Sequence, residues 1–227
     1  MIIMYYCLKN ERETLMPEIK ISASILNSDL GNLREMAKKV DESNIEYLHY
    51  DVMDGEFVEN ITYGSGIQAA IKPDSKAIMD THLMVMHPGR QIKLFAKAGS
   101  DIITFHEESD CDISAVIDEI KSYGVKAGLA IKPGTPAERV FPYLDKLDMV
   151  LVMTVEPGYG GQGFITSTLE KIAAIREKAP HIDIQVDGGI NAETAKLVKK
   201  AGANILVSGT YLFRAENMKS AADALRD

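Results

Sequence analysis

Four side chains that can ligate a metal ion stand at the ends of apolar segments in this chain of 227 residues. His49 and Asp51 are two positions apart, so an extended backbone places both side chains on one face. His82 and Asp187 end two later apolar segments. Two imidazoles and two carboxylates that converge form a donor set for one divalent cation, such as Zn²⁺, Fe²⁺, Mn²⁺ or Co²⁺. The pattern therefore predicts a metal site.

The other three histidines are expected to have no ligand role. His106 also ends an apolar segment, but a lone histidine in this position is more often a hydrogen-bonded core residue. His87 precedes Pro88, and His181 lies between two periodic segments, so both are expected at the surface.

Glycines gather at three points late in the chain, each directly after an apolar segment. They are Gly158, Gly160 and Gly161 around Tyr159, then Gly188 and Gly189, then Gly209 before Thr210. Glycine lets backbone N–H groups approach a ligand closely, and consecutive N–H groups form an anion cradle. A short helix over 210–213 would add its N-terminus to such a cradle. A single pair would be ordinary turn glycines, but three sites on consecutive loops favour phosphate binding.

The chain needs parallel strands whose carboxyl ends meet if these residues are to lie together. From residue 19 onward, apolar segments predict strands at 19–25, 45–51, 76–83, 101–106, 125–131, 148–155, 182–187 and 203–208. Helical periodicity between them predicts helices that include 29–43, 88–98, 112–123, 165–178 and 191–200. Asn191 can cap the last of these helices and Gly202 can end it, while Pro88 suits a first helical turn.

Strands that alternate with helices indicate an α/β protein with a parallel sheet. Eight such units predict a (β/α)8 TIM barrel, in which the active site lies at the carboxyl ends of the strands. An open doubly wound sheet usually has a glycine-rich turn after its first strand, whereas Ser24-Ile25-Leu26-Asn27 follows here. We therefore expect residues 19–227 to form a single barrel domain.

The segment before the first strand, residues 1–18, is expected to be a poorly ordered N-terminal extension. Its start, MIIMYYCL, is apolar. It has no positive region before it and no small-residue cleavage site after it, so the pattern does not indicate a signal peptide.

The composition excludes several classes of protein. With 46% hydrophobic and 26% charged residues, the chain is typical of globular proteins rather than disordered or fibrous ones. Its 25 basic and 33 acidic residues give a net charge of −8, which argues against nucleic-acid and membrane-surface partners. No apolar run reaches the ~20 residues of a transmembrane helix. Cys7 and Cys111 cannot form a disulfide framework, which favours a reducing compartment.

The chain resembles the ribulose-phosphate 3-epimerase family over residues 19–213. The motifs that carry the resemblance are SASIL, HYDVMDGEFVENITYG, DTHLMV, ITFHEE, VLVMTVEPGYGGQGFI, VDGGIN and GANILVSGTYLF. The resemblance implies a barrel of the ribulose-phosphate-binding type that interconverts D-ribulose 5-phosphate and D-xylulose 5-phosphate in the pentose phosphate pathway. It also implies a cytoplasmic homo-oligomer, either a dimer or a hexamer.

The resemblance assigns a role to each site residue. Asp51 and Asp187 would act as acid and base and would also bind the metal together with His49 and His82. Ser24 and His82 would contact the substrate. Phosphate would be held by the glycine motifs, which are Gly158, Tyr159, Gly160 and Gly161, then Gly188 and Gly189, then Gly209 and Thr210.

This sequence departs from the family's pattern at a few positions. Tyr159 stands where phenylalanine is usual, and Thr210 where serine is usual. Residues 27–30 replace a more typical alanine-aspartate-phenylalanine run. None of these positions is one of the expected metal ligands.

The chemistry explains why two aspartates and a metal ion would be needed. Inversion of a carbon beside a ketone removes a proton from one face and returns one to the other, so a single fixed base is not enough. A divalent cation on the substrate oxygens would stabilise the ene-diolate that forms. Met53, Met84 and Met153 are candidates either for an aprotic pocket wall or for ordinary core packing. The glycine loop after the sixth strand is a candidate lid.

Three other functions remain open from the sequence. Allulose-6-phosphate 3-epimerase shares almost every motif, although Gly188-Gly189-Ile190 favours the pentulose enzyme. A Schiff-base aldolase could use Lys132 at the end of the fifth predicted strand. A non-catalytic sugar-phosphate sensor would not need two opposed carboxylates, which argues against it.

Overall fold

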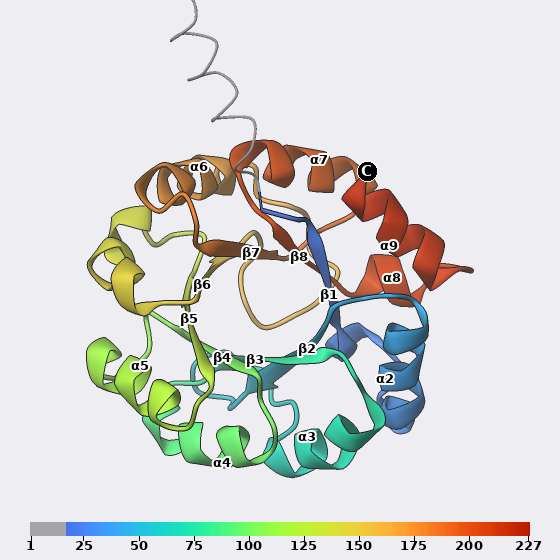
Figure 1. Ribbon diagram of the computed structural model, residues 1–227, viewed down its shortest axis with the longest axis horizontal. Helices are drawn as coiled ribbons and strands as arrows, with labels where there is room; N and C mark the ends of the chain where they lie inside the picture. The colour runs from blue at the N-terminus through green and yellow to red at the C-terminus, as the bar shows by residue number, and fades with distance from the viewer. Residues whose placement is uncertain (1–16) are drawn as a thin grey trace, which may run out of the picture.

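The computed structural model describes residues 17–227, in which strands and helices alternate around a closed ring (Figure 1). All eight strands are parallel, and each pairs with the next before β8 pairs with β1. The strands are β1 (Lys20–Ser24), β2 (Tyr47–Met53), β3 (Ile78–Met84), β4 (Ile102–His106), β5 (Lys126–Ile131), β6 (Met149–Met153), β7 (Asp183–Asp187) and β8 (Ile205–Ser208). The predicted TIM barrel is confirmed. Residues 1–16 of the predicted extension lie outside the described part of the chain.

Helices form the outer layer of the barrel. The α-helices are α2 (Leu33–Glu42), α3 (Ser65–Ile71), α4 (Ile92–Lys97), α5 (Ile113–Ser122), α6 (Thr168–Lys178), α7 (Ala192–Ala201), α8 (Thr210–Phe213) and α9 (Met218–Arg226). Short 3₁₀ helices join them at η1 (Ile25–Asn27), η2 (Leu30–Asn32), η3 (Lys72–Asp74), η4 (Pro88–Arg90), η5 (Ala137–Arg139) and η6 (Phe141–Lys146). Within residues 17–227, every helix is too short or too polar to cross a membrane.

Two of the predicted helices differ in the structure, and one connection in the described chain, for which the sequence indicated no helix, has no α-helix. The segment predicted as 88–98 divides into η4 and α4, and the segment predicted as 29–43 begins as η2 and becomes α-helical only at Leu33. Between β5 and β6 the described chain forms only the 3₁₀ helices η5 and η6. Pro136 and Pro142 lie in that connection, and proline lacks the N–H that an α-helix needs in its interior.

Helix α7 begins and ends as predicted. The Asn191 side chain accepts hydrogen bonds from the backbone N–H groups of Glu193 and Thr194, and the Thr194 hydroxyl accepts one from the backbone N–H of Asn191. Gly202 ends the helix with φ of 115°, in the left-handed region that glycine tolerates best.

Asn191→Ala is expected to destabilise the protein because it removes the acceptor for two N–H groups of α7. Loss of an N-cap costs about 1 kcal/mol, which in a domain of this size lowers Tm by roughly 2–4 °C. Thermal unfolding followed by circular dichroism measures this shift. Asn191→Asp keeps the acceptor oxygen and should unfold near the wild-type temperature, and equal Tm values for all three proteins would contradict the capping role.

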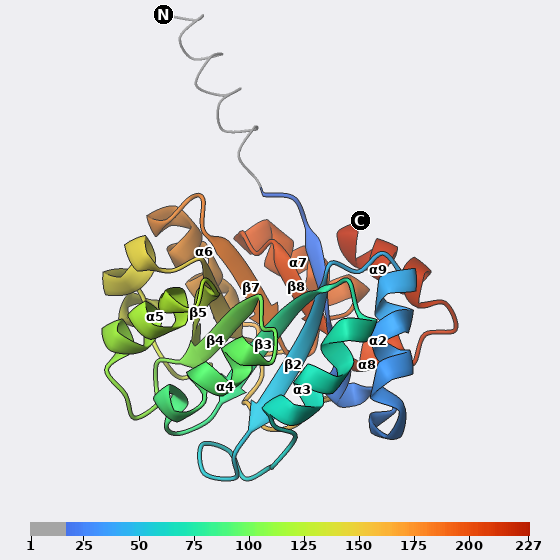
Figure 2. The ribbon, with the colours of Figure 1, turned by 60° about the horizontal axis from the view of Figure 1, so that its bottom comes forward.

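The barrel interior is apolar at one end and polar at the other. Tyr47, Ile102, Met149 and Ile205 form a buried cluster from the even-numbered strands, which is the layer of four side chains typical of such barrels. This layer closes the end of the barrel at which the strands begin, and the polar side chains lie between it and the carboxyl ends of the strands. Those ends point downward in Figure 2, where the loop after β2 projects from the barrel.

Candidate active site

The four predicted ligand residues lie together inside the barrel. One ligand atom from each of His49, Asp51, His82 and Asp187 lies within 4.8 Å of the others. Asp51 Oδ1 is 3.2 Å from His49 Nε2 and 3.1 Å from His82 Nδ1. Asp187 Oδ2 is 3.8 Å from His49 Nε2 and 3.9 Å from His82 Nδ1. Because the barrel is closed, β2 and β7 approach each other although β1 and β8 lie between them.

Hydrogen bonds fix the orientation of His49 and Asp51. His49 Nδ1 lies 2.7 Å from Asp80 Oδ2. The same oxygen accepts hydrogen bonds from Ser22 Oγ at 3.0 Å and from Gln185 Nε2 at 2.5 Å. Ser24 Oγ donates to Asp51 Oδ2 at 2.7 Å. A proton on His49 Nδ1 satisfies Asp80 and leaves Nε2 with its lone pair toward Asp51 and Asp187.

This donor set fits a divalent cation. When His49 is neutral with its proton on Nδ1, its Nε2 and the carboxylates of Asp51 and Asp187 are all acceptors, and a cation between them would satisfy all three. Ligands about 2.1 Å from a tetrahedral Zn²⁺ are roughly 3.4 Å apart. The nitrogen–oxygen separations of 3.1 to 3.9 Å in this site are of that size.

The electrostatics of the site favour positive charge. Burial raises the pKa of Asp187, and the Asp51 carboxylate raises it further, to about 6. Burial also acts to raise the pKa of Asp51, but His49 and His82 outweigh it and hold that pKa below its usual range. Burial opposes the charged form of His49, yet Asp51 and Asp80 raise the pKa of its imidazole well above the usual value. A buried cluster with three carboxylates therefore attracts a cation.

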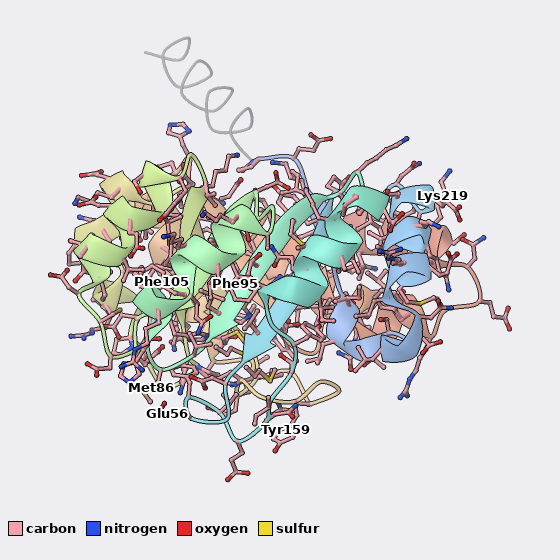
Figure 3. All side chains as sticks on the ribbon, turned by 90° about the horizontal axis from the view of Figure 1, so that it is seen from below. Glu56, Met86, Phe95, Phe105, Tyr159 and Lys219 are labelled. Atoms are coloured by element: carbon pink, nitrogen blue, oxygen red, sulfur yellow. The ribbon has the colours of Figure 1, made fainter. Side chains whose placement is uncertain are left out.

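A cavity opens over this cluster at the carboxyl ends of the strands. The predicted site residues in its lining are Ser24, Asp51, Met53, Met84, Met153, Gly158, Tyr159, Gly160, Gly161, Asp187, Gly188, Gly189, Gly209 and Thr210. His49 and His82 do not line it, because both are fully buried beneath. His82, which was predicted to contact the substrate, therefore reaches the cavity only through its neighbours. Figure 3 shows Tyr159 on the outer loops of this face, and its side chain is 57% exposed.

Among the cavity residues that sequence reasoning missed, Asn27 and Gln162 make side-chain hydrogen bonds at the glycine loops. Asn27 extends between two glycine loops, and Thr210 Oγ1 donates to its Oδ1 at 3.2 Å. Gln162 donates to the carbonyls of Glu156 and Tyr159 and so ties together the loop after β6. Asn27 could have been found from its position after the first strand, and Gln162 from its position within the glycine-rich motif.

The glycine loops are closely packed around the cavity. Gly188 and Gly189 have φ of 119° and 66°. A Cβ atom at Gly189 would lie 2.9 Å from the backbone nitrogen of Phe164, and one at Gly160 would lie 2.2 Å from Oδ1 of Asn27. Side chains at these positions would displace the backbone that lines the cavity.

The three histidines that were not predicted as ligands lie in different environments. His106 is fully buried and hydrogen-bonded, as predicted, and it contacts His82 through Nε2 atoms 2.9 Å apart. Burial lowers the pKa of His106 to about 4, so its ring is neutral at pH 7. His181 is exposed. His87 is half-buried rather than fully at the surface, with Nδ1 3.5 Å from Asp110 Oδ2.

The family model and the curated relatives agree on one family, and solved structures of other enzymes share the fold. The model of the ribulose-phosphate 3 epimerase family matches residues 20–213. Ribulose-phosphate 3-epimerase of Candida glabrata is 45% identical over 213 residues, 87% of each chain. The cytoplasmic isoform of ribulose-phosphate 3-epimerase of Oryza sativa subsp. japonica is 41% identical, over 91% of this chain and 92% of that one. The crystal structure of 3-keto-L-gulonate-6-phosphate decarboxylase from Vibrio cholerae has the same fold, with a TM-score of 0.70 at 15% identity, over 92% of this chain and 96% of that one.

Proposed function

Because the chain belongs to the ribulose-phosphate 3-epimerase family, it is an isomerase, and we propose that Asp51 and Asp187 exchange the proton at C3 of D-ribulose 5-phosphate to give D-xylulose 5-phosphate. The observation that carries this proposal is the pair of aspartates that enters one cavity from β2 and β7. One carboxylate takes the proton from one face of C3, and the other acid returns a proton to the opposite face. Ser24 holds the Asp51 carboxylate in position.

His49, Asp51, His82 and Asp187 would hold one divalent cation at the floor of this cavity. When bound, the cation supplies Lewis acidity, which stabilises the negative charge that develops on the substrate oxygens during proton removal. The mixed nitrogen and oxygen donor set suits Zn²⁺, Fe²⁺, Mn²⁺ or Co²⁺.

The phosphate group is proposed to bind the glycine loops on the far side of the cavity. Gly158 to Gly161, Gly188 with Gly189, and Gly209 with Thr210 all line it, and their backbone N–H groups can approach an anion without obstruction. The loop after β6 would act as the lid that excludes water. Asn60 Nδ2 donates to the Gly158 carbonyl at 3.2 Å, which connects this loop to the loop after β2.

Gly189→Ala is expected to weaken substrate binding. The added methyl group collides with the backbone of Phe164 at a residue whose φ is 66°, so the N–H groups nearby must move. Loss of one charge-assisted hydrogen bond costs about 1.5–3 kcal/mol, which should raise KM at least about tenfold. Steady-state kinetics measure this change. Gly66→Ala adds the same methyl group to open space on α3, outside the cavity lining, and serves as the control. An unchanged KM for Gly189→Ala would place the phosphate elsewhere.

The three methionines of the cavity are proposed to form an aprotic wall. Met53 and Met84 pack with Phe57, and Met153 packs with Leu151 and Ala130. A wall without exchangeable protons would keep water from protonating the ene-diolate.

The contacts of Lys132 argue against an aldolase. Its Nζ lies 3.8 Å from the centre of the Phe57 ring, and the residue does not line the cavity. A sensor protein would not need the two aspartates, and the curated relatives are named for ribulose phosphate rather than allulose phosphate.

We also propose a cytoplasmic location and a homo-oligomeric assembly. The Oryza sativa relative is named a cytoplasmic isoform, which supports a cytoplasmic location. A dimer or hexamer is proposed from the family, and the absence of nucleic-acid and membrane partners is proposed from the net charge of −8.

The proposed function is tested with purified protein and D-ribulose 5-phosphate in deuterated water. Proton NMR should show D-xylulose 5-phosphate with deuterium at C3. The specificity constant kcat/KM should be higher for the pentulose phosphate than for D-allulose 6-phosphate. A protein that leaves C3 of D-ribulose 5-phosphate unchanged would overturn the proposal.

A further inference from the structure

A chain of hydrogen bonds leads from the cation site to the loop after β5. His82 Nε2 lies 2.9 Å from His106 Nε2, and His106 Nδ1 lies 3.1 Å from Glu108 Oε2. The other oxygen of Glu108 accepts hydrogen bonds from the backbone N–H of Lys132, at 2.8 Å, and from the Thr135 hydroxyl. His106 and Glu108 do not line the cavity, so they can act on the reaction only through His82.

The direction of each hydrogen bond in this chain is determined by its outer end. A backbone N–H can only donate, so the Lys132 end requires an acceptor oxygen on Glu108. Burial acts to raise the pKa of Glu108, but the hydrogen bonds from His106, Thr135 and Lys132 outweigh it and lower that pKa to about 2, so Glu108 is a carboxylate. The second carboxylate oxygen then requires a proton on His106 Nδ1. A neutral His106 presents Nε2 as an acceptor, and His82 must therefore carry its proton on Nε2. This leaves the lone pair of His82 on Nδ1, which lies 3.1 Å from Asp51 Oδ1 inside the cation site.

We propose that Glu108 and His106 are positioning residues that hold His82 in the tautomer able to bind a cation through Nδ1. The inference rests on the proposed function, in which His82 is a cation ligand. His49 has a carboxylate, Asp80, as its direct partner, whereas His82 receives the same support through one intervening imidazole. Both histidines thus present a lone pair to the site.

Neighbouring residues hold the relay in place. Lys171 Nζ donates to the carbonyl of Lys132 at 3.0 Å and to that of Thr135 at 2.6 Å, and so holds the loop that anchors Glu108. The Phe57 ring packs against His106, with ring centroids 4.7 Å apart. The hydrogen bond between His82 and His106 is buried, and buried hydrogen bonds are stronger than exposed ones, so a mismatched donor there is correspondingly costly.

Glu108→Gln reverses the relay with almost no change of shape. The amide oxygen is drawn to the two donors at Lys132 and Thr135, which turns the NH₂ group toward His106 Nδ1. His106 must then accept at Nδ1 and carry its proton on Nε2, facing His82. His82 is pushed to the Nδ1–H tautomer, in which a proton occupies the position of the cation.

Cation affinity is the first measurement. Zn²⁺ or Co²⁺ is titrated into the full-length apo protein in competition with a chromogenic chelator. Changes to the partners of metal ligands typically weaken affinity about 10- to 100-fold, and we expect a loss in this range for Glu108→Gln. Glu107→Gln is the matched control, because Glu107 is an adjacent buried carboxylate that pairs with Arg139 and lies outside the relay. It should bind the ion as the wild type does.

The tautomers themselves are the second measurement, and they need no variant. Long-range ¹H–¹⁵N correlation spectra of the Zn²⁺-loaded wild type should show His106 protonated on Nδ1 and His82 protonated on Nε2. His106 protonated on Nε2 would overturn the relay, as would wild-type affinity in Glu108→Gln. A wild type that binds no cation at all would overturn the proposed function and this inference with it. Normal wild-type binding with an unaffected Glu108→Gln variant would overturn the relay alone.

Discussion

Asp187→Asn should lower kcat for epimerisation by about 10²- to 10⁴-fold, the range that one general acid or base contributes. Asparagine has the shape of aspartate and keeps an oxygen that can ligate a cation, but it cannot take up a proton. Asp187 lines the cavity with its side chain 17% exposed, so the loss falls on the chemical step rather than on the fold. Metal content of the variant is measured first, because the residue would also bind the cation.

The variant should separate proton exchange from inversion. Asp51 can still take the C3 proton from one epimer and return a deuteron to the same face in deuterated water. That epimer would slowly acquire label without becoming the other sugar, and NMR of the substrate pool shows both outcomes.

Asp183→Asn is the matched control for this experiment. It removes the same charge from the amino end of β7, where Asp183 faces Lys20, and it should react at the wild-type rate. Near-normal inversion by metal-replete Asp187→Asn would refute the two-base mechanism. His106 does not line the cavity and therefore cannot replace Asp187 as an acid in direct contact with the substrate.

The convergence of His49, Asp51, His82 and Asp187 was predictable from two features of the fold, strand alternation and barrel closure. Alternation along a strand places His49 with Asp51, and closure of the barrel brings β2, β3 and β7 together at one end. Asp80 follows the same rule, because it lies two positions before His82 on the same face. Strand alternation predicts the face on which Asp80 lies, but its contact with His49 depends on the register between β2 and β3. In that register Asp80 is the direct neighbour of His49 on the paired strand.

The role of Glu108 was not predictable, because this residue and its partners Lys132 and Thr135 lie in loops. Glu108 is two residues beyond the end of β4, and its partners Lys132 and Thr135 belong to the next loop. No periodicity relates these three positions. The same is true of Asn27, whose side chain crosses the cavity to Thr210, 183 residues later.

Removal of the divalent cation is expected to have the second large effect on activity. Metal-ion stabilisation of developing charge is worth several kcal/mol, so a chelated protein should lose at least about 100-fold in kcat, since each 1.4 kcal/mol is a factor of ten. Zn²⁺, Mn²⁺, Fe²⁺ or Co²⁺ added back should restore turnover. Metal analysis of the chelated sample accompanies the kinetics. Full activity in a verified metal-free preparation would remove the cation from the mechanism.

The same treatment should change stability, which tests the site without reference to catalysis. A ligand that binds only the folded state at 100 times its Kd stabilises by about 2.7 kcal/mol, which corresponds to a rise in Tm of roughly 5–10 °C in a domain of this size. The physical reason is the cluster of buried acceptors, in which Asp51 and Asp187 repel each other until a cation lies between them.

His49→Ala should abolish the rise in Tm on addition of Zn²⁺, because it removes one ligand and leaves the carboxylates uncompensated. His181→Ala removes an exposed histidine and should respond like the wild type. An equal rise in both variants would show that the ion binds outside the barrel.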